Sequence, residues 1–191
     1  MTETPIGAGR SSFQDIDSNK LFSEIHLKED MTFLDVACGR GAYSIAAARH
    51  IGEKGVIHAV DKWEEGIEHL KKEISERNIQ SIRATVADVS RKLPLETASV
   101  DVCLMAMVLH DLFRDGKGEG ALKEVQRVVK PEGVLAVVEF KKIDGPPGPP
   151  IDMKISPKEL EAVLSPYGFR VKQTMEIGSI RYLSIFTKSP A

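Results

Sequence analysis

Two glycines follow a short apolar run early in the chain. Gly39 and Gly41 come directly after Thr32–Ala37 (TFLDVA), and Ala42–Ile51 behind them has the pattern of a helix. Glycine lets a backbone turn tightly and lets a ligand approach without a Cβ in the way. The N-terminus of the following helix offers unpaired N–H groups to an anionic part of a ligand. The pattern predicts a strand, a glycine turn and a helix that together bind a small molecule.

A carboxylate ends the next apolar run. Asp61 follows Gly55–Val60, and at the end of a second strand it can accept hydrogen bonds from both ribose hydroxyls of an adenosine cofactor. The alternative is that Asp61 caps the helix that begins near Trp63, because Asp is a favoured capping residue. The third glycine of the dinucleotide fingerprint would stand at position 44, where this chain has Ser44. This difference disfavours NAD and FAD.

A second carboxylate ends the third expected strand, Ser81–Ala87. Asp88 is placed there to accept the adenine amino group, and Val89 is placed to pack on the base. Taken alone, Asp88 would be equally well explained as a turn residue, because Asp favours turns. The glycine turn and Asp61 shift the balance toward a binding role.

The elements that must hold these residues alternate between strands and helices, which predicts parallel strands joined by right-handed crossovers. The further strands are expected at Val100–Val108 and Val134–Phe140, the latter after a turn at Pro131–Gly133. Helices are expected at Phe13–Leu27 (one or two short ones), Trp63–Arg77, Ala121–Lys130 and from Ser156 to near Tyr167. Lys141–Pro150 is expected to be a loop, and Phe169–Met175 and Arg181–Lys188 to form an antiparallel hairpin.

These motifs together resemble the class I S-adenosylmethionine (SAM)-dependent methyltransferases, and most closely their methyltransferase type 11 group of ubiquinone/menaquinone type. The resemblance covers about residues 30–140. It is carried by Leu34–Gly41 (LDVACGRG), Asp61, Ala87-Asp88, Pro94-Leu95, Ser99–Val102 and Val129–Gly133. It implies an α/β fold with a Rossmann-like, doubly wound, seven-stranded and mostly parallel sheet, ending in an antiparallel hairpin. Arg40 and Glu132 depart from the commoner residues of the group.

The resemblance also assigns roles in a cofactor site. Asp35, Gly39 and Gly41 would surround the methionine end of SAM, Asp61 would bind the ribose and Asp88 the adenine. Further residues expected in this site are Ala37, Lys62, Ala87, Val89 and Met105. The expected activity is transfer of the SAM methyl group, which leaves S-adenosylhomocysteine.

A base for the acceptor would lie at the carboxyl ends of the fourth and fifth strands, where open α/β sheets place their ligands. The candidates are His110, Asp111, Glu139 and Lys141. His110 is favoured because its usual pKa suits proton transfer near neutral pH. The alternative is that His110 and Asp111 start the loop toward the next helix and only shape the site. Tyr43, directly after the glycine turn, would touch the cofactor or pack beneath it.

The chain divides into an N-terminal segment, 1–28, expected to be partly helical, and a methyltransferase domain, 29–191. No large insertion forms a cap, so a lid would come from residues 9–28 and from the loop 141–155. Its expected apolar lining is Phe13, Phe22, Met153 and Ile155.

Composition narrows the class of partner. A net charge of −2 without a basic stripe disfavours nucleic acid. The sequence has no cluster of cysteines and histidines that would indicate a metal site. Its two cysteines, Cys38 and Cys103, fit a reducing cytoplasm better than a disulfide framework. Neither a signal peptide nor a membrane-spanning run is expected. We expect the methyl acceptor to be a small, partly apolar molecule. One alternative is a methyltransferase that acts on a protein side chain, and another is a module that binds SAM without catalysis. A homodimer through the edge of the terminal hairpin is a further expectation.

Overall fold

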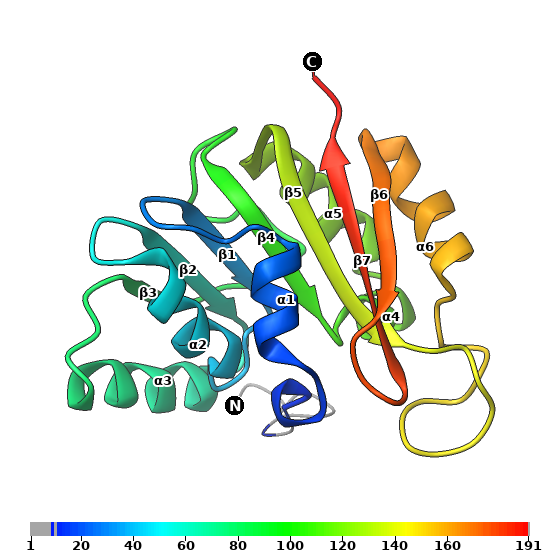
Figure 1. The fold of residues 1–191 in the computed structure, drawn as a ribbon, viewed down its shortest axis with the longest axis horizontal. Coiled ribbons are helices and arrows are strands. Elements are labelled where there is room, and N and C mark those ends of the chain that lie inside the picture. The colour runs from blue at the N-terminus through cyan, green and yellow to red at the C-terminus, as the bar shows by residue number, and fades with distance from the viewer. Residues whose placement is uncertain (1–8, 10, 191) are drawn as a thin grey trace.

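A single seven-stranded sheet forms the centre of the protein. The computed structural model describes residue 9 and residues 11–190. The strand order is β3-β2-β1-β4-β5-β7-β6 (Figure 1). The strands are β1 (Thr32–Val36), β2 (Val56–Asp61), β3 (Ile82–Val86), β4 (Val100–Ala106), β5 (Val129–Phe140), β6 (Phe169–Glu176) and β7 (Arg181–Lys188). The doubly wound, Rossmann-like sheet predicted from the sequence is confirmed.

Helices cover both faces of this sheet. One core cluster joins it to α1, α2 and α3, with Leu21 and Ile67 among its members, and a second joins it to α4, α5 and α6, with Leu122 and Leu160 among its members. The helices are α1 (Ser18–Glu24), α2 (Ala42–Ile51), α3 (Glu64–Glu76), α4 (Leu109–Arg114), α5 (Gly118–Val128) and α6 (Pro157–Leu164), with short 3-10 helices η1 (Phe13–Asp15) and η2 (Ser165–Tyr167). Within residues 11–190, none of the helices is long and apolar enough to cross a membrane.

The strands β1 to β5 run parallel, so their carboxyl ends meet at one edge of the sheet. In Figure 1 this is the lower edge, toward which β4 and β5 point. Residues 102–105 of β4 are all buried, as expected for a strand covered on both faces. The segments that follow β1, β2, β3, β4 and β5 therefore emerge side by side, and the predicted site residues lie in them or in the adjoining parts of the strands.

The connection from β4 to β5 differs from the expectation. A short helix, α4, begins at Leu109, where a loop was expected, and α5 begins at Gly118, before the expected Ala121. Strand β5 begins at Val129, because Val129 pairs with Val100 and a register shift follows. Glu132 has a φ of 62°, which is a left-handed conformation. The expected turn at residues 131–133 is therefore an irregularity inside β5.

The C-terminal hairpin is present as predicted. Strand β7 lies between β5 and β6 and runs antiparallel to both. The helix before it, α6, begins with the expected capping box, in which Ser156 accepts from the backbone of Glu159 and the Glu159 carboxylate accepts from the backbone of Ser156. The two strands of the hairpin also place Arg181, the first residue of β7, at the same edge as the end of β5.

The N-terminal segment packs on the domain. Leu21, Phe22 and Ile25 are at most 2% exposed and belong to the same core cluster as β1 and α2. The backbone N–H of Asp17 donates to the carbonyl of Ile177, between β6 and β7, at 3.0 Å. Residues 1–8 and 10 of the expected segment lie outside the described residues. The boundary at residue 28 and the role as a lid stay predictions.

Candidate cofactor and acceptor site

The turn after β1 has a left-handed backbone at three positions. The φ angles are 57° at Ala37, 57° at Gly39 and 76° at Gly41. This conformation costs a residue with a Cβ about 1–2 kcal/mol, so Ala37 is held in it by its surroundings. The backbone N–H of Gly41 donates to the carbonyl of Cys38 at 2.8 Å and closes the turn. Because α2 starts at Ala42, the strand–turn–helix unit is the one predicted.

The two glycines are needed for different reasons. A Cβ on Gly39 would have no atom within 4 Å, so the space beside it is open to a ligand. A Cβ on Gly41 would collide with a methyl group of Leu70 in α3. Gly41 therefore allows α3 to pack against the turn, and Gly39 is the glycine beside which a ligand can approach.

Asp61 ends β2, the neighbour of β1, and its carboxylate holds the glycine turn. Its Oδ2 accepts from the N–H of Gly39 at 2.7 Å and its Oδ1 from the N–H of Trp63 at 2.8 Å. The N-cap residue of α3 is Trp63 itself, so Asp61 is not the capping residue. A carboxylate has about four lone-pair positions, and two of them remain to accept ribose hydroxyls.

Asp35 lies in β1 directly before the turn and is 1% exposed. The hydroxyl of Ser44, in the first turn of α2, donates to its Oδ2 at 2.6 Å. Burial raises the pKa of Asp35 to about 7, against the lowering effect of the Ser44 hydrogen bond and with a further rise from the charge of Asp61. A cation that binds nearby would therefore favour the ionised form of Asp35.

Asp88 follows β3 and is fully engaged in polar contacts. Its Oδ2 accepts from Nζ of Lys117, at the start of α5, at 2.7 Å, and its Oδ1 accepts from the hydroxyl of Ser90 at 2.6 Å. Burial opposes its ionisation, but the bonds from Lys117 and Ser90 outweigh burial and lower the pKa of Asp88 to about 2. Asp88 is therefore a fixed anion, and an adenine amino group would have to share its oxygens with Lys117 and Ser90.

The other residues expected in the cofactor site differ in how far their side chains are exposed. Lys62 is exposed beside Asp61, and Ala87 is half-buried after β3. Val89 is 7% exposed and packs in the core. Met105 is fully buried inside the sheet, so the expected contact with the cofactor is not supported. The half-buried Met107, with a φ of 58°, lies at the end of β4 instead.

His110 and Glu139 form a buried pair at the ends of β4 and β5. The Nδ1 atom of His110 lies 2.8 Å from Oε2 of Glu139, and the backbone N–H of His110 donates to Oε1 at 3.2 Å. Glu139 is fully buried and His110 is 7% exposed. Burial opposes protonation of the imidazole, but the hydrogen bond and charge of Glu139 outweigh it and raise the pKa of His110. His110 lies within α4, whereas the sequence placed it at the start of a loop.

The two remaining candidates for a base are occupied by ion pairs. Oδ1 of Asp111 lies 2.7 Å from Nη1 of Arg114, and Nζ of Lys141 lies 2.7 Å from Oε1 of Glu176. Of the four candidates, the structure therefore brings only His110 and Glu139 into direct hydrogen-bond contact.

Tyr43, in the first turn of α2, connects the glycine turn with the N-terminal segment. Its hydroxyl lies 2.7 Å from that of Ser12, and the ring of Phe13 meets it edge-on with centroids 5.2 Å apart. Burial raises the pKa of Tyr43 to about 12, so the phenol keeps its proton at neutral pH. The free thiol of Cys38 nearby is buried.

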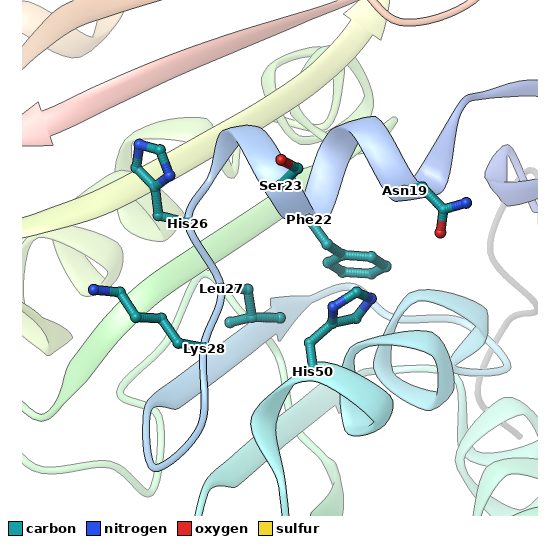
Figure 2. A pocket seen from close by; sticks show the side chains of 7 residues that line it. All are labelled: Asn19, Phe22, Ser23, His26, Leu27, Lys28 and His50. Atoms are coloured by element: carbon teal, nitrogen blue, oxygen red, sulfur yellow. The ribbon is translucent and has the colours of Figure 1, made fainter.

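A shallow cavity of about 320 Å³ lies between α1 and the end of α2 (Figure 2). The ring of Phe22 lies against the imidazole of His50, with centroids 4.8 Å apart. His50 is in the last turn of α2, whereas the glycine turn is at its first residue. This cavity is therefore separate from the site. Phe22 is buried in the core cluster, and its expected place in the lining of a lid stays a prediction.

Comparison with known proteins agrees with this geometry. A family model described as a methyltransferase domain matches residues 33–133. A SAM-dependent methyltransferase from Aquifex aeolicus superimposes with a TM-score of 0.83 at 30% identity, over 93% of this chain and 92% of that one. The chain belongs to the SAM-dependent methyltransferases. The family uses SAM as its cofactor, as the resemblance of the motifs implied.

Relatives of lower sequence identity indicate the group of methyltransferases that the chain resembles. A demethylmenaquinone methyltransferase from Lactobacillus johnsonii is 26% identical over 127 residues, which are 66% of this chain and 51% of the relative. A ubiquinone/menaquinone biosynthesis C-methyltransferase from Paraburkholderia phymatum is 28% identical over 124 residues, or 65% of this chain and 49% of the relative. The chain thus spans about half the length of the curated relatives that it matches. These similarities support the type 11 group.

The residues at the edge of the sheet fit SAM. The open space beside Gly39 admits a ligand, and Asp61 keeps two acceptor positions beside it. The raised pKa of Asp35 suits a cationic ligand group, because such a group would stabilise its ionised form. These features match the roles that the resemblance assigns to the three residues.

Sequence reasoning missed several contacts of the site. Ser44 was read only as the absence of a glycine, yet it holds Asp35. Lys117 and Arg181 were not singled out, and Glu139 was named as a base but not as the partner of His110. These are contacts between residues far apart in the sequence, and no local pattern in one sequence reports them.

Proposed function

We propose that the protein transfers a methyl group from SAM to a small, partly apolar acceptor, with His110 as the base. The observation that carries this proposal is the buried pair of His110 and Glu139 at the same sheet edge as the glycine turn. Strands β1 and β4 are neighbours, so the turn after β1 and the start of α4 emerge side by side. A base beside a cofactor site is the arrangement that methylation of a weakly acidic group needs.

Four residues would hold the cofactor. Gly39 leaves open space, Asp61 would accept the ribose hydroxyls, Asp88 would face the adenine, and Asp35 would favour the cationic methionine end. Ala37, Gly41, Lys62, Ala87 and Val89 complete the proposed site. When bound, the cofactor supplies a methyl group that its sulfonium already activates, and S-adenosylhomocysteine remains.

If His110 is the base, its contact with Glu139 favours Nε2 as the nitrogen that takes the proton. Ionised Glu139 only accepts hydrogen bonds, so Nδ1 of His110 carries the hydrogen and Nε2 keeps a lone pair when the ring is neutral. Nε2 lies 3.7 Å from Oδ2 of Asp111, too far for a hydrogen bond. Nε2 is therefore available to accept a proton from an O–H or an acidic C–H group of the acceptor.

The acceptor class follows from the relatives and from the walls of the site. The matched relatives are named as methyltransferases of demethylmenaquinone and of ubiquinone/menaquinone biosynthesis. Phe140 packs at the end of β5, with its ring centroid 5.9 Å from that of His110, and offers an apolar wall beside the base. A ring-shaped acceptor with an ionisable hydroxyl suits both observations.

We place the reaction in the cytoplasm, with a free small molecule as the partner. The edge strand β6 is where a homodimer would form. It carries the exposed Lys172 and a register shift between Val171 and Gln173, and both features hinder edge pairing. Sedimentation of the purified chain would measure its oligomeric state directly.

The activity is tested with methyl-labelled SAM and reduced 1,4-naphthoquinone under anaerobic conditions, with 1,4-dimethoxynaphthalene as the acceptor that has no ionisable hydroxyl. The proposal expects label in the first compound and none in the second. His110→Asn should slow transfer by about 10²–10⁴-fold while leaving S-adenosylhomocysteine binding intact. If His110→Asn is as active as the parent chain, His110 is not the base.

A further inference from the structure

A buried arginine at the acceptor end of the site has a donor without a partner. Arg181 begins β7 and is 7% exposed. Its Nη2 atom lies 3.0 Å from Oδ2 of Asp15, whose side chain is 58% exposed. Its Nε is the one buried side-chain nitrogen or oxygen without a hydrogen-bond partner among the described residues. An unpaired buried donor is costly, and a ligand atom is one of the few features that offset the cost.

Arg181 lies within reach of both halves of the site. It pairs with Phe140 across β5 and β7, and its guanidinium carbon lies 5.3 Å from the centre of the Phe140 ring. The same ring is in edge contact with His110. On the other side, the charge of Arg181 acts on Tyr43, where it lowers the pKa against the effect of burial. Arg181 therefore lies against the aromatic ring that contacts His110, and its charge also acts on the residue that follows the cofactor turn.

The surroundings of Arg181 carry excess positive charge. Lys154 is 2% exposed and lies 5.8 Å from the centre of the Phe140 ring. Its Nζ donates to the carbonyls of Ile143 at 2.7 Å and Gly145 at 3.0 Å. Two buried basic side chains thus lie near one aromatic ring, and of the two only Arg181 has an ion-pair partner among the described residues, the exposed Asp15. The buried carboxylate of Glu139 is bound to His110. Such an environment attracts an anion.

We propose that Arg181 binds an anionic oxygen of the methyl acceptor, so that the acceptor is a small aromatic or conjugated oxyanion. The inference rests on the proposed function. When His110 Nε2 takes a proton from the acceptor, the electron pair stays on the acceptor and becomes the pair that bonds to the methyl carbon. The guanidinium stabilises the negative charge during this step. The oxyanion is either this phenolate or enolate, or a permanent carboxylate.

Three ligands with one ring system test the proposal on protein saturated with S-adenosylhomocysteine. They are 1-naphthoate, a permanent anion, 1-naphthol, which can ionise, and the neutral 1-naphthamide, each titrated by calorimetry. The proposal expects an anion to bind at least about tenfold more tightly than the amide. Tight naphthoate binding indicates a carboxylate acceptor. Naphthol binding that strengthens with pH indicates a phenolate acceptor.

Variants identify the residue responsible. Arg181→Met keeps most of the side-chain volume and should remove the preference for the anion, with the affinity for S-adenosylhomocysteine unchanged within about twofold. Arg170→Met, an exposed arginine of β6, is the matched control and should keep the preference. Asp15→Asn removes the competing carboxylate and should tighten anion binding about two- to fivefold. If the ion pair of Arg181 and Asp15 is only structural, Asp15→Asn should leave anion binding unchanged.

Three results would overturn the inference. They are equal binding of the anions and the amide, no binding of any of the three ligands, and a preference that survives Arg181→Met. Failure of S-adenosylhomocysteine itself to bind the parent chain counts against the proposed function and so against its extension. If S-adenosylhomocysteine binds and the anion preference is absent, only the role of Arg181 is wrong.

Discussion

The backbone N–H of Gly39 donates to Oδ2 of Asp61 at 2.7 Å, which ties the glycine turn after β1 to the end of β2. The two features were separate motifs in the sequence, and the fold joins them by one hydrogen bond. The bond holds the carboxylate beside Gly39, where a Cβ would have no atom within 4 Å. Preorganisation of this kind reduces what the protein must order when a ligand binds.

Asp61→Ala should weaken the affinity for SAM and S-adenosylhomocysteine by at least about tenfold, since hydrogen bonds to a charged group contribute roughly 1.5–3 kcal/mol. The variant loses the proposed ribose contacts and the bond that holds Gly39. Calorimetric titration measures the effect. Glu64→Ala, an exposed carboxylate in the first turn of α3, is the control and should bind normally. Unchanged affinity in folded Asp61→Ala protein would contradict the assignment.

The rate of methyl transfer should rise with pH, because His110 must lose its proton before it can act as a base. The pKa of His110 is raised above its usual 6.5 by Glu139, so the midpoint of the profile should lie above that value. Glu139→Gln removes the negative charge and should shift the midpoint to lower pH. The measurement is the rate at saturating cofactor across the pH range.

His110→Asn provides the companion test, and its rate should fall by about 10²–10⁴-fold, the usual contribution of general base catalysis. The side chain of His110 also contacts the buried carboxylate of Glu139, so its replacement can change the stability of the fold. A thermal unfolding scan therefore has to accompany the rate. If the midpoint of the pH–rate profile is the same in Glu139→Gln as in the parent chain, Glu139 has only a structural role.

Gly41→Ala should destabilise the fold more than Gly39→Ala does. Both glycines have positive φ, but only the Cβ at position 41 would collide with Leu70. Overpacking adds about 1–3 kcal/mol to the cost of the backbone conformation. Denaturant unfolding of the two variants, and of Gly41→Ala combined with Leu70→Ala, measures the coupling. If Leu70→Ala restores nothing, the collision is not the cause.

Asp35→Asn should gain stability relative to the parent chain as pH rises from about 4 to 7. The native pKa of about 7 lies above the ordinary 3.8, so the native state holds the proton more tightly. Its contribution to stability is fully present below pH 3.8 and is lost as pH rises through about 7. Thermal unfolding without cofactor at several pH values measures this difference. A difference that does not vary with pH would contradict the burial of an ionisable Asp35.

Much of the fold was predictable because its signals are local. The apolar run at residues 102–105, the glycine turn and the capping box at Ser156 each specify their own element. The start of β5 at Val129 was not predictable, because it depends on pairing with Val100. The short α4 was missed for a similar reason, since the backbone of His110 is anchored by the distant Glu139.

In the candidate site, too, local signals could be predicted from the sequence and contacts between distant residues could not. Carboxylates at strand ends are visible in the sequence, so Asp61 and Asp88 could be named. Whether a side chain reaches the sheet edge is a property of the packed sheet, so the sequence could not show that Met105 is fully buried, and its contact with the cofactor stays a prediction. That Nε of Arg181 has no hydrogen-bond partner among the described residues depends on burial and on distant neighbours, which one sequence does not report.

The most direct test of the central claim is calorimetric titration of the purified chain with SAM, S-adenosylhomocysteine and NADH. Ser44 donates to Asp35 at the position where a dinucleotide site would need its third glycine. We predict micromolar binding of the first two ligands and none of NADH. Binding of NADH alone, or no binding of either SAM or S-adenosylhomocysteine, would contradict the account.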